Sequence, residues 1–240
     1  MNPTFAPMMD ILPAAQRKLW PELRPAVDRG FVLFGGTAIA LQIGHRGSVD
    51  FDFFSVKPLD RNDLLASFSF MKQSTVLQDT SDTLSVLVPY GASEQDHVKV
   101  SFFGSIDNGR VGEPLLTKDG VMKVATLDDL MATKVKTILQ RVEAKDYRDI
   151  AAMAVAGVSL SKGLAAARKL YGPNFQPSES LKAMVFFEGG DLNTLTRNEK
   201  KTLVDVVGSV RELPSIEIIG QEQKKARPIL KKRRSAERSR

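Results

Sequence analysis

The segment 31–54 limits the possible folds most strongly, because three different patterns follow one another in it. Residues 31–34 are apolar and end at two glycines, as expected of a buried strand that turns sharply. Residues 37–43 have the length and composition of a short helix that stops at Gly44. Residues 49–54 alternate apolar and acidic side chains, which predicts a second strand. The segment therefore predicts a strand, a glycine corner, a helix and a strand in immediate succession.

The rest of the chain divides into a mixed part and a helical part. Before residue 125 we expect a helical stretch broken by Pro21 and Pro25 (10–29), a helix (59–70), two paired strands joined by a polar turn around Gly91 (84–90 and 98–103), and a short strand (121–124). From Thr126 onward the apolar residues recur at helical spacing only. The expected helices are 127–139, 146–155, 162–170, 179–187 and 198–213. This pattern predicts an α+β fold.

We expect three parts along the chain. A mixed α/β domain occupies residues 1–125, and a helical domain in residues 126–220 completes a cleft with it. Residues 221–240 contain nine Lys or Arg and two Glu, so this tail carries a net charge of +7 while the rest carries −1. Such a tail is expected to be disordered. It could also hold RNA or DNA phosphates by counterion release, which makes a nucleic-acid-binding protein acting through its tail one hypothesis.

The composition excludes several classes of site. Cysteine is absent, which removes disulfides and thiolate chemistry and suits a reducing compartment. The two histidines, His45 and His97, lie far apart, which argues against a histidine-rich zinc site. No Gly-x-Ser-x-Gly elbow of a serine hydrolase is present. No apolar run is long enough to cross a bilayer, and residues 1–10 lack the pattern of a secretory signal, so we expect a cytoplasmic protein without membrane association.

Two acidic residues on the second strand predict a metal site. Asp50 and Asp52 are two residues apart, so both project from one face, about 7 Å apart along the strand. Val49, Phe51 and Phe53 are expected to pack inward from the other face. Adjacent carboxylates repel each other unless water or a cation lies between them. Mg²⁺ is commonly held by one or two carboxylates together with substrate phosphates, so we expect Mg²⁺, or Mn²⁺, at this face.

The glycine corner predicts a phosphate site beside the acids. Gly35 and Gly36 permit tight backbone, and the free N–H groups that open the following helix favour a phosphate. Thr37 adds a hydroxyl there, and Arg46 and Ser48 lie where they could reach the same phosphates. A glycine pair alone is usually a turn, and an Asp-x-Asp alone is usually a solvated strand face. Their occurrence in order, with one helix between them, is far more specific.

This arrangement resembles a known family. Gly35-Gly36-Thr37, a helix and then Arg46-x-Ser48-x-Asp50-x-Asp52 resemble the signature of the polymerase-β-like nucleotidyltransferase superfamily, and within it the AbiEii-like abortive-infection toxins. A second region, from residue 130 to residue 150, resembles the second motif of those toxins. Its matching polar residues are Lys134, Arg141, Lys145, Asp146 and Asp149. The resemblance covers roughly residues 30–150 and implies a nucleotidyltransferase-type mixed sheet with flanking helices.

The resemblance also implies roles for these residues. Asp50 and Asp52 would ligate the metal, while Lys134 would contact the nucleotide phosphates and Asp146 would complete the catalytic set. The nucleotide-binding residues would be Gly35, Gly36, Thr37, Arg46, Ser48 and Arg141. Residues seven apart share a helix face, so we expect Lys134 and Arg141 on one face. Ordinary surface charge pairs, such as Lys145 with Asp149, are the alternative explanation of this region.

The activity implied is transfer of a nucleoside monophosphate from a nucleoside triphosphate (NTP) to an acceptor, with release of pyrophosphate. The acceptor would be RNA, such as a tRNA 3′ end, or a protein hydroxyl. A toxin of this kind would damage its own host unless opposed, so the resemblance implies a cognate antitoxin.

One position departs from the superfamily pattern. Nucleotidyltransferases of this kind commonly carry a third carboxylate on a neighbouring strand, where this chain has Ser101. Three hypotheses remain open: Asp96 or Asp146 substitutes, transfer is slow, or the chain is a degenerate module that binds nucleotide without transferring it. Other Asp-x-Asp enzymes fit less well. A haloacid-dehalogenase phosphatase differs after the second Asp, and a metal-dependent glycosyltransferase would not explain the glycine pair upstream.

Overall fold

The computed structural model describes residues 3–90, 96–107 and 109–220, and its centre is a mixed sheet. Within these ranges eight strands pair in the order β1-β7-β8-β2-β3-β6-β5-β4. The strands are β1 (Thr4–Phe5), β2 (Val32–Phe34), β3 (Asp50–Phe54), β4 (Thr75–Thr80), β5 (Thr83–Pro89), β6 (His97–Phe103), β7 (Leu115–Thr117) and β8 (Lys123–Val124). Antiparallel β2 and parallel β6 flank β3, which places the acidic strand in the middle of the sheet.

The predicted strands are all present, and three more accompany them. β5 and β6 form the expected antiparallel pair, while the turn predicted around Gly91 falls outside the described residues. The strands that sequence reasoning did not predict are β1, β4 and β7. All six residues of β4 are exposed, so this edge strand has no alternation of buried and exposed positions for a pattern to reveal. β1 and β7 are too short to show a period.

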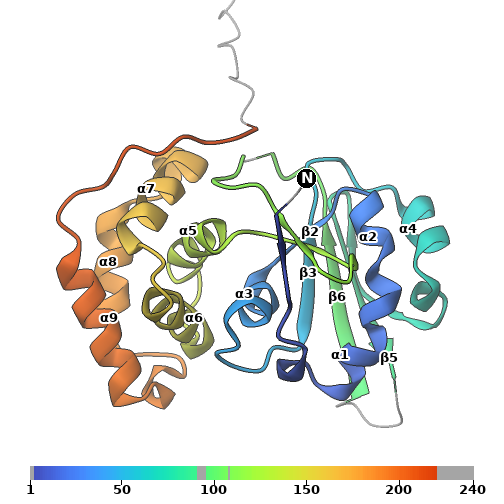
Figure 1. Ribbon diagram of the computed structural model, residues 1–240, viewed down its shortest axis with the longest axis horizontal. Coiled ribbons are helices and arrows are strands. Elements are labelled where there is room, and N and C mark those ends of the chain that lie inside the picture. The colour runs from blue at the N-terminus through green and yellow to red at the C-terminus, as the bar shows by residue number, and fades with distance from the viewer. Residues whose placement is uncertain (1–2, 91–95, 108, 221–240) are drawn as a thin grey trace, which may run out of the picture.

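The two faces of the sheet differ sharply in chemistry. In β3 the side chains of Phe51 and Phe53 are fully buried, and those of Val100 and Phe102 continue the same face in β6. The helices α1 (Ala14–Leu19), α2 (Pro25–Asp28) and α4 (Arg61–Ser67) cover that face, on the right in Figure 1. The opposite face carries Asp50 and Asp52 together with the partly exposed ring of Phe54, and it looks towards α3 (Gly35–Ile43) and the helices that follow the sheet. Strand alternation has therefore separated a core face from a face available for chemistry.

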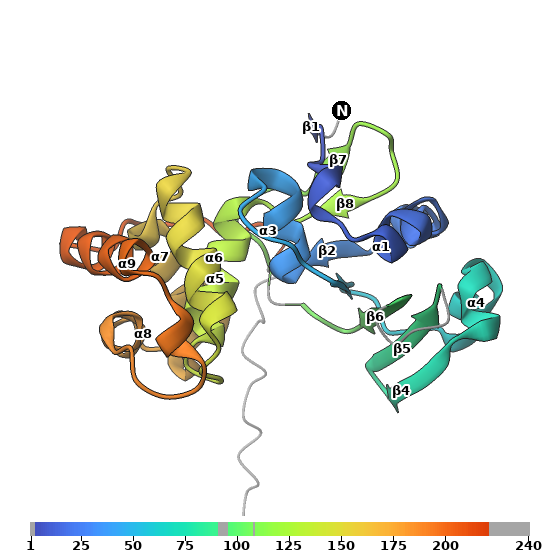
Figure 2. The same ribbon diagram turned by 90° about the horizontal axis from the view of Figure 1, so that it is seen from below.

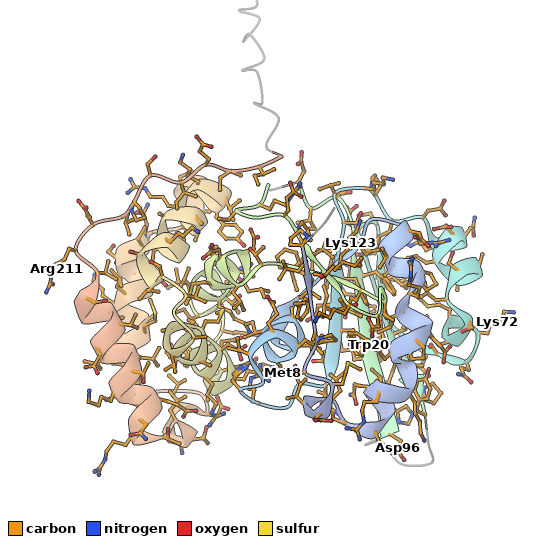
Figure 3. All side chains as sticks on the ribbon, viewed as in Figure 1. Met8, Trp20, Lys72, Asp96, Lys123 and Arg211 are labelled. Atoms are coloured by element: carbon orange, nitrogen blue, oxygen red, sulfur yellow. The ribbon has the colours of Figure 1, made fainter. Side chains whose placement is uncertain are left out.

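The N-terminal helical stretch is broken where the prolines predict. A short 3-10 turn, η2 (Trp20–Leu23), separates α1 from α2, and another, η1 (Met9–Ile11), precedes α1. Trp20 lies between these helices and the sheet (Figure 3), with its ring centroid 6.3 Å from that of Phe51. Its Nε1 donates a hydrogen bond to Asp119 at 2.8 Å. The helix predicted over 59–70 is shorter, because α4 ends at Ser67 and the 3-10 segment η3 (Ser69–Gln73) follows.

Helices account for the second half of the described chain, as the change of period at residue 126 predicts (Figure 2). They are α5 (Leu127–Thr137), α6 (Ala144–Val155), α7 (Leu160–Tyr171), α8 (Pro177–Val185) and α9 (Arg197–Ser209), with short 3-10 segments at Gly172–Asn174 and Leu192–Thr194. Thr126 caps α5 by accepting a hydrogen bond from the backbone N–H of Asp129. The last helix ends at Ser209, earlier than the predicted residue 213, and Val210 is already extended. Pro214 also disfavours helical backbone at the residue before it.

The segment after α9 returns to the sheet half of the molecule. It runs along the top of Figure 1, and Ile219 pairs with Arg110 through two backbone hydrogen bonds of 3.0 and 2.8 Å. The predicted basic tail, 221–240, lies outside the described residues. The division into separate domains at residue 125 stays a prediction. In the part of the chain that the structure describes, no helix has both the length and the apolar character to span a membrane.

Candidate active site

The glycine corner packs directly against the acidic strand. α3 begins at Gly35, two residues before the predicted start, and no side chain caps its N-terminus. Gly35 has φ of +77°, and a Cβ there would lie 2.9 Å from Oδ2 of Asp52. A Cβ on Gly36 would lie 2.3 Å from Nη2 of Arg46. Position 35 therefore needs glycine for its backbone conformation, and a side chain at either position would displace Asp52 or Arg46.

The two acids lie on the polar face of β3, as predicted. Asp50 is paired across the sheet with Lys99, and Asp52 with Ser101. Burial raises the pKa of Asp52, and the charge of Asp50 raises it further, while Lys99 and Lys134 oppose that shift. An anionic pair of this kind favours a bound cation. Val49 does not pack inward as expected: it precedes β3 and its side chain is 54% exposed.

Ser101 occupies the place next to Asp52 where a third carboxylate was expected. Its hydroxyl is buried, lowers the pKa of Asp52 and accepts a hydrogen bond from Ser85 at 3.1 Å. Asp96, one suggested substitute, lies just before β6 at the lower edge of the sheet in Figure 3. It is not among the residues that line the cavity described below.

A network of ion pairs around two buried carboxylates adjoins the acids. Lys134, on α5, lies between two carboxylates of α6, with Nζ 2.5 Å from Asp146 and 2.7 Å from Asp149. Arg141 binds Asp146 at 2.8 Å, and Arg46 binds Asp149 through two hydrogen bonds of 2.7 and 3.0 Å. The described network thus joins α5 and α6 to the loop that leads into β3.

Arg141 reaches this network by a different route from the one predicted. α5 ends at Thr137, and backbone hydrogen bonds from residues 139–141 to α5 carbonyls turn the chain after it. Lys134 and Arg141 therefore do not share a helix face, although both bind Asp146. The suggested surface pair between Lys145 and Asp149 is absent from the described ion pairs, because Lys145 binds Glu143 at 2.7 Å.

The two carboxylates of α6 are fully buried, and both are held as anions. Burial opposes ionisation of Asp149, but His45, Lys134 and Arg46 outweigh it and hold its pKa well below the usual range. Burial likewise opposes ionisation of Asp146, and Arg141 and Lys134 lower its pKa. Asp146 does not line the cavity and contacts Lys134 and Arg141 instead. Its visible role is to orient these two cations.

The acids, the glycines and the cations line one cavity of about 410 Å³. Two carboxylates, Asp50 and Asp52, line it together with five cationic side chains. The cationic residues are Arg46, Lys99, Lys134, Arg141 and Lys145. Sequence reasoning did not select Lys99 or Lys145 for this site. The alternation of buried and exposed residues in β6 could have predicted that Lys99 projects from the polar face of its strand. Only the register of β6 against β3 shows that Lys99 is paired with Asp50.

The hydroxyls predicted to bind phosphate are placed differently from each other. Ser48 lines the cavity, whereas Thr37 is buried behind it and is not among the lining residues. Thr37 Oγ1 donates a hydrogen bond to the backbone carbonyl of Asp50 and lies 2.8 Å from Oγ of Ser48. Thr37 thereby joins the glycine corner to the start of the acidic strand.

The carboxylates of the cavity suit a metal ion that binds together with a phosphate-containing substrate. Among the described residues, no group of three or more His, Cys, Asp or Glu side chains could by itself hold a metal ion. Asp50 and Asp52 supply two carboxylates at the cationic cavity. Mg²⁺ is typically held by one or two carboxylates with substrate phosphates completing its octahedron, so these residues fit Mg²⁺ bound with a polyphosphate. They do not form a protein-only metal cage.

Comparison with known proteins agrees with this geometry. The family model described as "Nucleotidyl transferase AbiEii toxin, Type IV TA system" matches residues 22–222. An uncharacterized protein of Aquifex aeolicus (strain VF5) is 31% identical over 183 residues, which cover 72% of this chain and 84% of that protein.

Two solved structures share the fold. MenT4, a nucleotidyltransferase toxin of Mycobacterium tuberculosis H37Rv, has a TM-score of 0.55 at 14% identity and covers 82% of this chain and 84% of its own. An antigenic nucleotidyltransferase-like protein of Paracoccidioides brasiliensis has a TM-score of 0.51 at 15% identity, with 86% and 96% covered. The mixed sheet with its flanking helices is thus a nucleotidyltransferase fold. With a family model that spans most of the sequence, this chain belongs to the AbiEii nucleotidyltransferase toxin family of type IV toxin–antitoxin systems.

Proposed function

We propose that this chain transfers a nucleoside monophosphate from an NTP to a hydroxyl of an RNA or protein acceptor, with Mg²⁺ or Mn²⁺ as the metal. A bond forms between the acceptor oxygen and the α-phosphorus, the bond from that phosphorus to the β-phosphate oxygen breaks, and pyrophosphate and the hydroxyl proton leave. One observation carries the proposal. The acid pair, the glycine corner and five cationic side chains line a single cavity of about 410 Å³.

Different groups of this cavity bind the phosphates, neutralise their charge and hold the metal ion. The N–H groups at the uncapped start of α3, at Gly35 and Gly36, donate to phosphate oxygens. Lys134 and Arg141, oriented by Asp146, neutralise charge on the phosphates. Asp50 and Asp52 would hold the metal ion, which when bound supplies Lewis-acid stabilisation of phosphate charge.

The helices after residue 125 are part of this proposal. Lys134 and Arg141 come from that half of the chain, while the acids come from the sheet. We therefore propose that residues 126–220 act as a helical domain that completes the cleft of domain 1–125. The family of a toxin–antitoxin system also supports a cognate antitoxin and action in the cytoplasm.

Ser101 favours a second candidate, a catalytically degenerate module that binds nucleotide without transferring it. A buried serine hydroxyl accepts a proton poorly, and it stands beside Asp52 where a third carboxylate was expected. In this function the cavity would bind NTP with Mg²⁺, and the acceptor would not react.

The two candidates differ in the fate of the α-phosphate. The protein is incubated with each α-labelled NTP, with Mg²⁺ or Mn²⁺, and with total cellular RNA or total cellular protein. Transfer predicts a labelled acceptor and free pyrophosphate, and the labelled species identifies both donor and acceptor. The degenerate module predicts thermal stabilisation by NTP with neither product.

Substitution of the paired acids tests the site itself. Asp50→Asn and Asp52→Asn each remove a metal-ligating charge and are expected to lower the transfer rate by about 100-fold or more. Asp205→Asn, on the exposed face of α9, is the matched control and should transfer at the wild-type rate. Circular dichroism checks that each variant is folded. Undiminished transfer by both folded acid variants would refute this assignment.

A further inference from the structure

A second cavity adjoins the first and has a different chemistry. Its volume is about 180 Å³, and its lining includes the apolar side chains Val32, Phe34, Phe54 and Ile106. Phe54 also lines the cationic cavity, and Phe34 immediately precedes Gly35 of the glycine corner. The two cavities are therefore neighbours across one aromatic wall.

That wall is a row of three rings. The ring centroids of Phe34 and Phe54 are 5.0 Å apart, and those of Phe54 and Phe103 are 4.8 Å apart. Phe34 is paired across the strands with Asp52, and Phe103 with Phe54, so the rings stand on the sheet face that carries the acids. None of the three is fully buried. An aromatic row of this kind offers ring faces and edges to a flat ligand.

One donor in the second cavity has no acceptor. Arg110 lines the cavity, and within the described residues its Nε is buried without a hydrogen-bond partner. Its Nη2 binds both oxygens of Glu113, at 2.7 and 2.8 Å, which neutralises the guanidinium charge. A buried donor without a partner is unfavourable, so an acceptor atom brought by a ligand would be favoured there.

The loop that carries Arg110 is held in place. The carboxylate of Asp129, which also lines the cavity, accepts hydrogen bonds from the backbone N–H groups of Val111 at 2.5 Å and Gly112 at 3.2 Å. The backbone of Arg110 pairs with Ile219 on its other side. The cavity is thus formed before any ligand arrives, as binding cavities usually are.

Size and charge indicate what such a ligand is. Whole small-molecule ligands usually occupy about 300–1,000 Å³, so a cavity of about 180 Å³ holds only part of one. Its only described cationic side chain is already neutralised, so it does not suit a phosphate. A flat, aromatic group with a hydrogen-bond acceptor suits both the rings and Nε of Arg110.

We propose that the second cavity binds the base of the donor NTP whose phosphates occupy the cationic cavity. The base contacts Phe34 and Phe54 and accepts a hydrogen bond from Nε of Arg110. This inference rests on the proposed function, because it assumes that the phosphates lie beside Asp50 and Asp52.

Comparing NTP with inorganic tripolyphosphate separates the base from the phosphates. Dissociation constants for both are measured by calorimetry, with Mg²⁺ present, on the full chain. Arg110→Lys removes the Nε donor but keeps a cation beside Glu113. Val56→Trp places bulk at the cavity from a side chain that is 63% exposed, so it does not disturb the core. Arg61→Lys is the matched control, because Arg61 binds Asp79 of the edge strand β4 and lines neither cavity.

We expect both cavity variants to bind NTP about tenfold more weakly and tripolyphosphate as the wild type does. The control should match the wild type for both ligands. An unchanged NTP affinity in both folded variants, or an equal loss for NTP and tripolyphosphate, overturns the base site. If the wild type binds neither ligand, the proposed function fails, whereas normal binding that is insensitive to Arg110 and Val56 removes this inference alone.

Discussion

Gly35 is where one added carbon would disturb the site most. Its φ of +77° is unfavourable for any side chain, and its Cβ would meet Oδ2 of Asp52 at 2.9 Å. Gly120 has a similar φ of +70° but no atom within 4 Å of its Cβ position. The two glycines thus share a backbone requirement, and only Gly35 adds a contact with the acid pair.

Alanine at these two positions separates backbone strain from displacement of the acid. Gly35→Ala and Gly120→Ala should each lower the free energy of unfolding by about 1–2 kcal/mol, measured by urea denaturation. Gly35→Ala should also lower nucleotidyl transfer by about tenfold or more, because Asp52 must move. Gly120→Ala should leave transfer unchanged. Equal transfer rates for the two variants would show that the contact with Asp52 is unimportant.

Asp149 is the most heavily paired carboxylate in the described network. Its oxygens contact Lys134 at 2.7 Å, His45 at 2.7 Å and Arg46 at 2.7 Å, and its side chain is fully buried. These partners hold its pKa below the usual range despite burial. A carboxyl with a lowered pKa in the folded state stabilises the protein above the unfolded-state pKa, and that contribution is lost as pH falls below it.

The Asp149→Asn variant should therefore be less stable in a pH-dependent way. At pH 7 we expect a loss of about 3–5 kcal/mol in the free energy of unfolding, since the variant leaves buried cations without their counter-charge. The difference from the wild type should shrink as pH falls below about 4, the usual pKa of an unfolded aspartate. Urea denaturation from pH 7 to pH 3 measures both effects. Asp79→Asn, at an exposed position, is the control, and a difference that stays constant with pH would contradict the linkage.

Helices α5 and α7 approach each other at a glycine. A Cβ on Gly163 of α7 would lie 2.3 Å from Cγ of Met131 on α5, and both positions are buried. Because α5 also carries Lys134, this packing sets the position of a cation in the cavity. Gly208 of α9 offers the opposite case, a helical glycine whose Cβ position has no atom within 4 Å apart from its chain neighbours and the nearby backbone of its own helix.

Alanine at these two helical glycines should change stability in opposite directions. Gly163→Ala overpacks the contact with Met131 and should destabilise the protein by about 1–3 kcal/mol. Gly208→Ala adds helix propensity without a clash and should stabilise it by up to about 1 kcal/mol. Thermal unfolding of both variants measures the effect. If Gly163→Ala stabilised the protein, α5 and α7 would be able to move apart without a loss of stability.

The charge of the whole chain is unevenly distributed. The net charge of +6 comes from residues 221–240, which carry +7, while the remaining residues carry −1. Gly220, the last described residue, lines the second cavity, and the basic segment follows it in the sequence. Lys and Arg side chains attract polyanions through counterion release, which is independent of nucleotide sequence.

Deletion of residues 221–240 tests whether NTP binding is independent of RNA binding by the basic segment. The truncated chain should bind NTP with unchanged affinity, because the residues that line both cavities remain. Its affinity for RNA should fall, and the slope of log affinity against log salt should become shallower by several units. Calorimetry with NTP and filter binding with RNA over a range of salt measure the two effects. Loss of NTP affinity on deletion would show that the tail belongs to the nucleotide site.

Local sequence patterns were sufficient to predict the strand and the glycine corner that form the acid pair's surroundings. Alternation in β3 and the glycine corner before α3 are properties of a few consecutive residues, so the sequence predicts Asp50 and Asp52 on one face beside Gly35. The change to helical spacing at residue 126 is equally local, and the helices follow it. The exposed edge strand β4 escaped prediction because burial imposes no pattern on it.

The neighbours of the acids depended on packing between distant segments. The register of β6 against β3 brings Lys99 opposite Asp50, and the packing of α5 on α6 buries Lys134 between Asp146 and Asp149. A period in the sequence tells which way a side chain points but carries no information on which strand or helix it will face. The acidic strand and its glycine corner could therefore be predicted from the sequence alone. The cationic wall, the burial of the α6 carboxylates and the cavity beside Phe54 arose only when segments far apart in sequence came into contact.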